Sequence, residues 1–124
     1  MSKNVLIIDD EDLVRLTLRQ TFEKAGFSVR EAANGRIGVE MHREEPADLI
    51  ITDIIMPDQE GVETIIQLRR EDADVPIIAM SGGGRIGATD YLEHARNYGA
   101  AQVFEKPFDR KEVVAAARAL LETG

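Results

Sequence analysis

Hydrophobic residues in this chain gather in short unbroken runs, and longer amphipathic stretches separate them. The run Val5–Ile8 and the run Leu49–Ile51 contain no polar residue. Apolar runs of this length without alternation are typical of strands buried on both faces of a parallel sheet. Phe27–Glu31 alternates instead, which predicts a strand with one partly exposed face. The predicted strands, in chain order, are Val5–Ile8, Phe27–Glu31, Asp48–Thr52, Pro76–Met80 and Ala101–Glu105.

The stretches between these runs have the spacing of helices. Val14, Leu18, Phe22 and Ala25 recur every three or four residues, which places them on one face of a helix that Gly26 ends. Four more helices are predicted: one capped by Asn34 and bearing Ile37 and Met41, one after Gly61, one over Thr89–Tyr98, and one capped by Asp109.

Strands that alternate with helices predict an α/β fold. We expect a doubly wound, five-stranded parallel sheet with five helices and right-handed crossovers. Residues 1–124 are expected to form a single domain, because no linker or repeat interrupts the pattern. The last helix uses up the chain, so we expect no output domain.

Composition and charge narrow the classes of function. The chain has 15 basic and 23 acidic residues and a net charge of −8, which argues against direct nucleic acid binding. It has no cysteine, so disulfides and thiolate metal sites are excluded. The apolar stretch at the N-terminus is too short, and meets Asp9 too soon, for a signal peptide or membrane span. We therefore expect a cytoplasmic protein without a membrane partner.

Polar residues stand at the ends of four of the predicted strands. These are Asp9, Asp10, Asp53, Ser81 and Lys106. Because the carboxyl ends of parallel strands lie at one edge of a sheet, we expect these side chains to meet there. Packing alone does not explain three carboxylates, a hydroxyl and an ammonium at one edge, so the sequence predicts a chemical site.

The charges at this edge predict what the site binds. Like charges about 4 Å apart repel by roughly 4 kcal/mol at an effective dielectric constant near 20. A Mg²⁺ ion would cancel the excess negative charge with oxygen ligands that it prefers. The ion and Lys106 would then hold phosphoryl oxygens, and Ser81 would donate one hydrogen bond. Asp53, in the middle of the edge, would be the nucleophile that forms an acyl phosphate.

The polar residues and their neighbours resemble the signature of the receiver domains of two-component response regulators. The matching residues are Asp9-Asp10, Asp53-Ile54-Ile55-Met56-Pro57 followed by Gly61, Ser81, and Lys106-Pro107-Phe108. The resemblance covers essentially the whole chain. It implies a flavodoxin-like receiver fold with strand order 2-1-3-4-5.

The resemblance also implies a role for each site residue. Asp53 would accept a phosphoryl group from a histidine kinase or a histidine phosphotransfer protein. Asp10 and Asp53 would bind Mg²⁺ (or Mn²⁺) directly, the backbone carbonyl of Ile55 would add a ligand, and Asp9 would act mainly through water.

Two more residues would contact the phosphoryl group in such a protein, namely Ser81 and Lys106. Receiver domains usually have a cis peptide bond before the proline that corresponds to Pro107, and we expect one here. The chain would then be a phosphoacceptor module, not a turnover enzyme, with self-catalysed phosphorylation and slow dephosphorylation.

The signal would leave through protein contacts. Phosphorylation would change the surface formed by the last two helices and the fifth strand. That surface would bind a downstream protein, which the sequence does not identify, or a second copy of the chain in a homodimer.

Two other functions fit parts of the pattern. A phosphatase with an aspartyl nucleophile, as in haloacid-dehalogenase-like enzymes, needs a carboxylate two residues after Asp53, and Ile55 occupies that position. A flavin-binding flavodoxin-like module would need an edge that attracts the flavin phosphate, whereas this edge is anionic. Both are less consistent with the residues than the receiver function.

The sequence departs from the receiver pattern in two places. Val103 stands where receivers usually have an aromatic residue three positions before the lysine, and alternation points Phe104 to the opposite face. The segment after Ser81, which begins Gly82-Gly83-Gly84, is longer and richer in glycine than is usual.

The two histidines, His42 and His94, lie on predicted helices. We expect both to be exposed to solvent, with no role as a metal ligand or relay.

Overall fold

The computed structural model describes residues 3–54, 61–82, 96–97 and 99–122. Three predicted features lie outside these residues. They are Ile55 with its backbone carbonyl, the glycine-rich segment beyond Gly82, and His94. The helix predicted over Thr89–Tyr98 also falls almost entirely outside them.

Five parallel strands form one sheet in the order β2-β1-β3-β4-β5, which confirms the predicted topology. The strands are β1 (Asn4–Ile8), β2 (Ser28–Ala32), β3 (Leu49–Asp53), β4 (Ile77–Gly82) and β5 (Gln102–Lys106). The described residues contain four long helices, α1 (Asp12–Lys24), α2 (Gly35–Glu44), α3 (Gly61–Glu71) and α5 (Arg110–Glu122).

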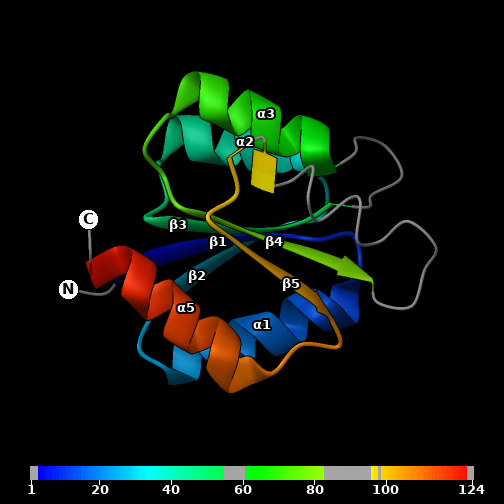
Figure 1. Ribbon diagram of the computed structural model, residues 1–124, viewed down its shortest axis with the longest axis vertical. Helices are drawn as coiled ribbons and strands as arrows, with labels where there is room; N and C mark the ends of the chain where they lie inside the picture. The colour runs from blue at the N-terminus through cyan, green and yellow to red at the C-terminus, as the bar shows by residue number, and fades with distance from the viewer. Residues whose placement is uncertain (1–2, 55–60, 83–95, 98, 123–124) are drawn as a thin grey trace.

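The helices cover both faces of the sheet (Figure 1): α2 and α3 lie on one face, and α1 and α5 on the other. Successive residues of β1 supply the two cores. Leu6 and Ile8 pack under α2 and α3, whereas Val5 and Ile7 pack under α1 and α5, as expected where side chains alternate along a strand. Within the described part of the chain, no helix combines the length and apolar character that a membrane crossing requires.

The predicted helix ends are confirmed by their hydrogen bonds. Asn34 Oδ1 accepts from the backbone N–H of Ile37 at 2.9 Å at the start of α2. Asp109 Oδ1 accepts from the N–H of Lys111 at 2.8 Å before α5. Gly26, after α1, has a φ of +98°, a conformation that favours glycine.

A second glycine lets α2 approach β1 closely. A Cβ atom built on Gly38 would lie 2.4 Å from Cδ1 of Ile8, which is buried completely. Any side chain at this point of α2 would therefore require the side chain of Ile8 to move. Since Asp9 directly follows Ile8, this close packing fixes the strand end from which the acidic residues extend.

The position that receivers usually fill with an aromatic side chain lies on the α2/α3 face. Val103 is half-buried and packs against the core of that face, whereas Phe104 packs against the core under α1 and α5. The prediction that these two side chains point to opposite faces is confirmed.

The prediction that His42 is exposed is wrong. Only 4% of the residue is accessible to solvent, because it lies one turn after Gly38 on the inner face of α2. Its Nδ1 accepts a hydrogen bond from the N–H of Ala47 at 3.0 Å, and its Nε2 lies 2.8 Å from Asp72 Oδ2. Since Nδ1 is an acceptor, Nε2 carries the hydrogen and donates to Asp72. The imidazole thus joins the end of α2 to the segment after α3.

The pKa of Asp72 reflects this contact. Burial acts to raise it, but the hydrogen bonds from His42 and from the N–H groups of Asp74 and Val75 outweigh burial and lower it.

Replacing His42 tests the importance of the buried hydrogen bond. His42→Leu introduces an apolar side chain of similar size and leaves the N–H of Ala47 without its acceptor. We expect a loss of roughly 1–3 kcal/mol in the free energy of unfolding, measured by urea denaturation.

His42→Asn is the matched variant, since its Oδ1 can replace Nδ1 as acceptor, and we expect it to recover part of the loss. Equal destabilisation by Leu and Asn would show that packing, and not the hydrogen bond to Ala47, accounts for the burial of His42.

Candidate functional site

Four carboxylates gather at the carboxyl ends of β1 and β3. Asp9, Asp10, Glu11 and Asp53 each offer an oxygen, and these oxygens all lie within 4.8 Å of one another. Asp9 and Asp53 are buried, whereas Asp10 and Glu11 are exposed. The structure thus brings together the three carboxylates predicted from the strand ends, and it adds Glu11.

Lys106 extends into this acidic cluster from the last residue of β5. Its Nζ lies 2.9 Å from Asp9 Oδ2, 3.3 Å from Asp53 Oδ2 and 3.4 Å from Glu11 Oε1. The peptide bond between Lys106 and Pro107 is cis, as expected from the resemblance. The predicted meeting of Lys106 with the carboxylates is therefore seen in the structure.

Burial and neighbouring charges shift the pKa values of Asp9 and Lys106. Burial is the main reason that the pKa of Asp9 is raised to about 6; the N–H of Glu11 and Lys106 act against this shift. For Lys106 burial alone would lower the pKa, but the hydrogen bond to Asp9 and the charges of Asp53, Asp9 and Glu11 outweigh it and raise the pKa. The lysine is therefore a cation at neutral pH.

Ser81 lies near the end of β4, next to the strand that carries Asp53. It is completely buried, and its Oγ has no hydrogen-bond partner among the residues that the structure describes. Asp53 pairs with Met80 in the sheet, so Ser81 lies one residue farther toward the carboxyl edge. A buried hydroxyl without a partner costs roughly 1–3 kcal/mol. Such a group at a carboxylate site is suited to bind an oxygen of a ligand.

The turn between β1 and α1 is held by hydrogen bonds to Asp9. Its Oδ1 accepts from the N–H of Glu11 at 2.9 Å, and its own N–H donates to the carbonyl of Ala32 at 3.1 Å. Its carbonyl accepts from Arg15 Nη1 at 2.6 Å. Glu11 and Arg15 were not predicted as site residues, although Glu11 directly follows the acidic pair.

The carboxylate oxygens of the cluster suit a hard divalent cation, one that prefers oxygen ligands. With all groups ionised, four carboxylates and Lys106 leave an excess of negative charge, and the oxygens are those that Mg²⁺ prefers. Phosphoryl oxygens, the buried hydroxyl of Ser81 and the ammonium of Lys106 are complementary in charge and hydrogen bonding. The arrangement suits a reaction that brings a negatively charged group up to Asp53.

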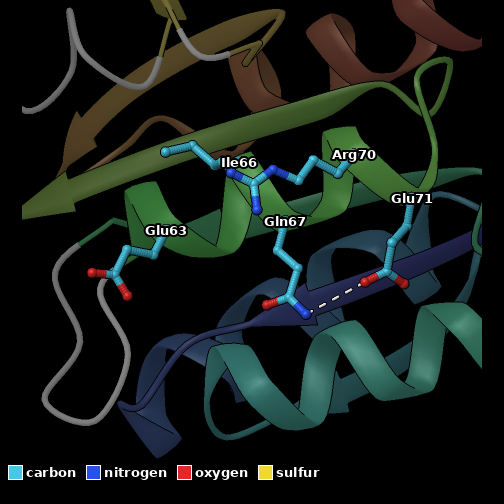
Figure 2. A pocket seen from close by; sticks show the side chains of 5 residues that line it. All are labelled: Glu63, Ile66, Gln67, Arg70 and Glu71. Carbon is cyan, nitrogen blue, oxygen red and sulfur yellow. Dashed lines mark hydrogen bonds between the residues drawn. The ribbon is translucent and has the colours of Figure 1, made fainter.

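A groove on α3 is separate from this cluster. Figure 2 shows that the five lining side chains all come from this helix, and none is a predicted site residue. Glu71, at the end of the helix, pairs with Arg43 and accepts from Gln67. The groove has a volume of about 550 Å³ and is lined by Glu63, Ile66, Gln67, Arg70 and Glu71.

Comparison with known protein families and structures gives a consistent result. The family model of the response regulator receiver domain matches residues 5–118. Sporulation initiation phosphotransferase F of Bacillus subtilis is 30% identical, over 98% of this chain and 95% of that protein. The transcriptional regulatory protein SrrA of Staphylococcus aureus is 35% identical over 98% of this chain, which spans about half (48%) of its length.

Solved structures agree with the family match. A putative response regulator from Chloroflexus aurantiacus superposes with a TM-score of 0.90 at 27% identity, over 98% of this chain and 99% of that one. The chemotaxis protein CheY4 of Vibrio cholerae shares the fold, with a TM-score of 0.87 at 24% identity, over 98% of this chain and 100% of that one. The chain belongs to the receiver domain family of two-component response regulators.

Proposed function

We propose that Asp53 accepts a phosphoryl group from a phosphohistidine of a histidine kinase or a histidine phosphotransfer protein. The observation that carries this proposal is the position of Lys106, whose ammonium lies between the buried carboxylates of Asp9 and Asp53. A fixed cation beside a buried carboxylate neutralises negative charge that develops when a phosphoryl group approaches. The family match supports the same role.

The transfer exchanges one bond for another at phosphorus. A carboxylate oxygen of Asp53 forms the new P–O bond while the P–N bond to the donor imidazole breaks, and the imidazole leaves with the electron pair. Lys106 neutralises charge on the phosphoryl oxygens, and the hydroxyl of Ser81 donates a hydrogen bond to one of them. This would give the buried Oγ of Ser81 a partner.

Mg²⁺ (or Mn²⁺) completes the proposed site. Asp10 and Asp53 would bind the ion directly, the backbone carbonyl of Ile55 would add a ligand, and Asp9 would act mainly through water. When bound, the ion supplies positive charge against the phosphoryl oxygens. The support for this assignment is the set of carboxylate oxygens within 4.8 Å of one another.

We further propose that residues 1–124 act as a single receiver domain, in the cytoplasm. It would be a phosphoacceptor module and not a turnover enzyme, since Ile55 cannot supply the proton transfer that a related phosphatase needs. Phosphorylation would change binding through β5, α5 and the helix predicted over Thr89–Tyr98, toward a downstream protein or a second copy of the chain. The phosphotransferase name of the Bacillus relative favours onward transfer to a histidine as another route.

Replacing the phosphoacceptor tests the proposal directly. Asp53→Asn removes the nucleophilic oxygen, so we expect no labelling by acetyl phosphate or by a cognate kinase with Mg²⁺, measured as phosphoprotein by intact mass. Asp48→Asn is the matched control: this exposed aspartate directly precedes β3. It should be labelled like the wild type.

Strong Mg²⁺-dependent labelling of the Asp53→Asn protein at another residue would refute the assignment.

The raised pKa of Asp9 predicts how metal binding depends on pH. Because this pKa is about 6 in the protein without metal, Asp9 is ionised at pH 7 and becomes protonated as the pH falls to 5. Protonation removes a charge that attracts the ion, so we expect the affinity for Mg²⁺ to fall by roughly tenfold over this interval. Isothermal titration with MgCl₂ measures it.

Asp9→Asn cannot ionise and should show weaker binding with little change between pH 7 and pH 5. The same slope in both proteins would mean that another group controls the pH dependence.

A further inference from the structure

The side chain of Arg15, on α1, is only 14% exposed to solvent although it carries a charge. Its guanidinium contacts three different segments. Nη1 donates to the backbone carbonyl of Asp9 at 2.6 Å, Nη2 bonds the carboxylate of Asp12, and Nε donates to Glu31 Oε1 on β2 at 3.3 Å. One planar group therefore joins the end of β1, the first turn of α1 and strand β2.

The contact with Asp9 lies on the peptide group that leads to Asp10. The carbonyl of Asp9 and the N–H of Asp10 belong to the same rigid plane. A hydrogen bond that fixes this carbonyl therefore fixes the direction in which the chain continues into Asp10. The N–H of Asp9 donates to the carbonyl of Ala32, and Asp9 Oδ1 accepts from the N–H of Glu11. Together with the bond from Arg15, three hydrogen bonds therefore fix the conformation of this turn.

We propose that Arg15 is a positioning residue for the acidic cluster: it holds the main chain of Asp9 so that the Asp9 and Asp10 carboxylates point at the metal site. The inference rests on the proposed metal site and adds a residue that contacts neither the ion nor the phosphoryl group. Arg15 acts through a carbonyl, while the carboxylates stay available for the cation.

Two effects of removing Arg15 have opposite signs, which makes the proposal testable. Loss of a positive charge near an acidic cluster strengthens its attraction for Mg²⁺. Loss of the hydrogen bond to the Asp9 carbonyl loosens the turn and weakens binding. Only the positioning role predicts weaker binding.

Arg19 provides a matched control one turn farther along α1. It pairs with the same carboxylate, Glu31, at 2.5 Å and with Glu23 at 3.3 Å. In the part of the chain that the structure describes, its hydrogen bonds go to these two residues and not to the Asp9 turn. Arg15→Gln and Arg19→Gln therefore remove the same charge and a contact to the same glutamate.

The experiment measures the affinity of the full chain for Mg²⁺ by isothermal titration at pH 7.5, beside urea denaturation in EDTA. We expect Arg19→Gln to bind Mg²⁺ as tightly as the wild type or slightly more tightly. Arg15→Gln should bind about tenfold more weakly, the usual size of the effect when a residue that orients metal ligands is removed. Urea denaturation in EDTA shows whether both proteins are folded.

Arg15→Lys keeps the charge but reaches only one acceptor, so this variant should bind Mg²⁺ with intermediate affinity. If Arg15→Gln does not fold, comparing the Mg²⁺ affinities of Arg15→Lys and Arg19→Lys tests the positioning role instead.

Equal affinities in the matched Arg15 and Arg19 variants, or tighter binding by Arg15→Gln, would overturn the positioning role while leaving the phosphorylation proposal intact. A wild-type protein that binds no Mg²⁺ would instead overturn the proposed metal site, and this inference with it. The two failures are distinguished by the wild-type titration alone.

Discussion

A single ammonium group joins three strands at the carboxyl edge of the sheet. Lys106 belongs to β5, whereas its partners Asp9 and Asp53 follow β1 and end β3, so its long side chain must extend past β4. Without that cation, two buried carboxylates whose oxygens lie within 4.8 Å of each other would repel by roughly 3–4 kcal/mol at an effective dielectric constant near 20. The acidic cluster therefore depends on a residue from the far side of the sheet.

The same groups that serve the proposed reaction weaken the free protein. Burial keeps the pKa of Asp9 well above its usual value, and the hydroxyl of Ser81 has no partner among the described residues. The apolar cores on both faces of the sheet offset these costs. In the proposed reaction the phosphoryl group supplies hydrogen-bond acceptors for Lys106 and Ser81, so groups that are unfavourable in the free protein become binding groups.

Most of the fold and five residues of the site follow from sequence patterns. These residues were predictable because parallel strands bring their ends to one edge, whatever the details of packing; they are Asp9, Asp10, Asp53, Ser81 and Lys106. His42 and Arg15 were not predictable, because both also have partners outside their own helices, and only tertiary packing decides whether a polar helix residue turns inward. The end of β3 is one residue later than predicted, since Asp53 pairs with Met80 and continues the ladder.

Strand β2 forms one edge of the sheet. Two neighbouring charged side chains of this strand, Arg30 and Glu31, make hydrogen bonds or salt bridges with other segments. Glu31 is bound by two arginines of α1, while Arg30 on the same strand donates to Asn4 and to the carbonyl of Glu45 beyond α2. Charged edge strands are poor templates for a strand from another molecule. The charged contacts of β2 thus protect the parallel sheet from growing at this edge.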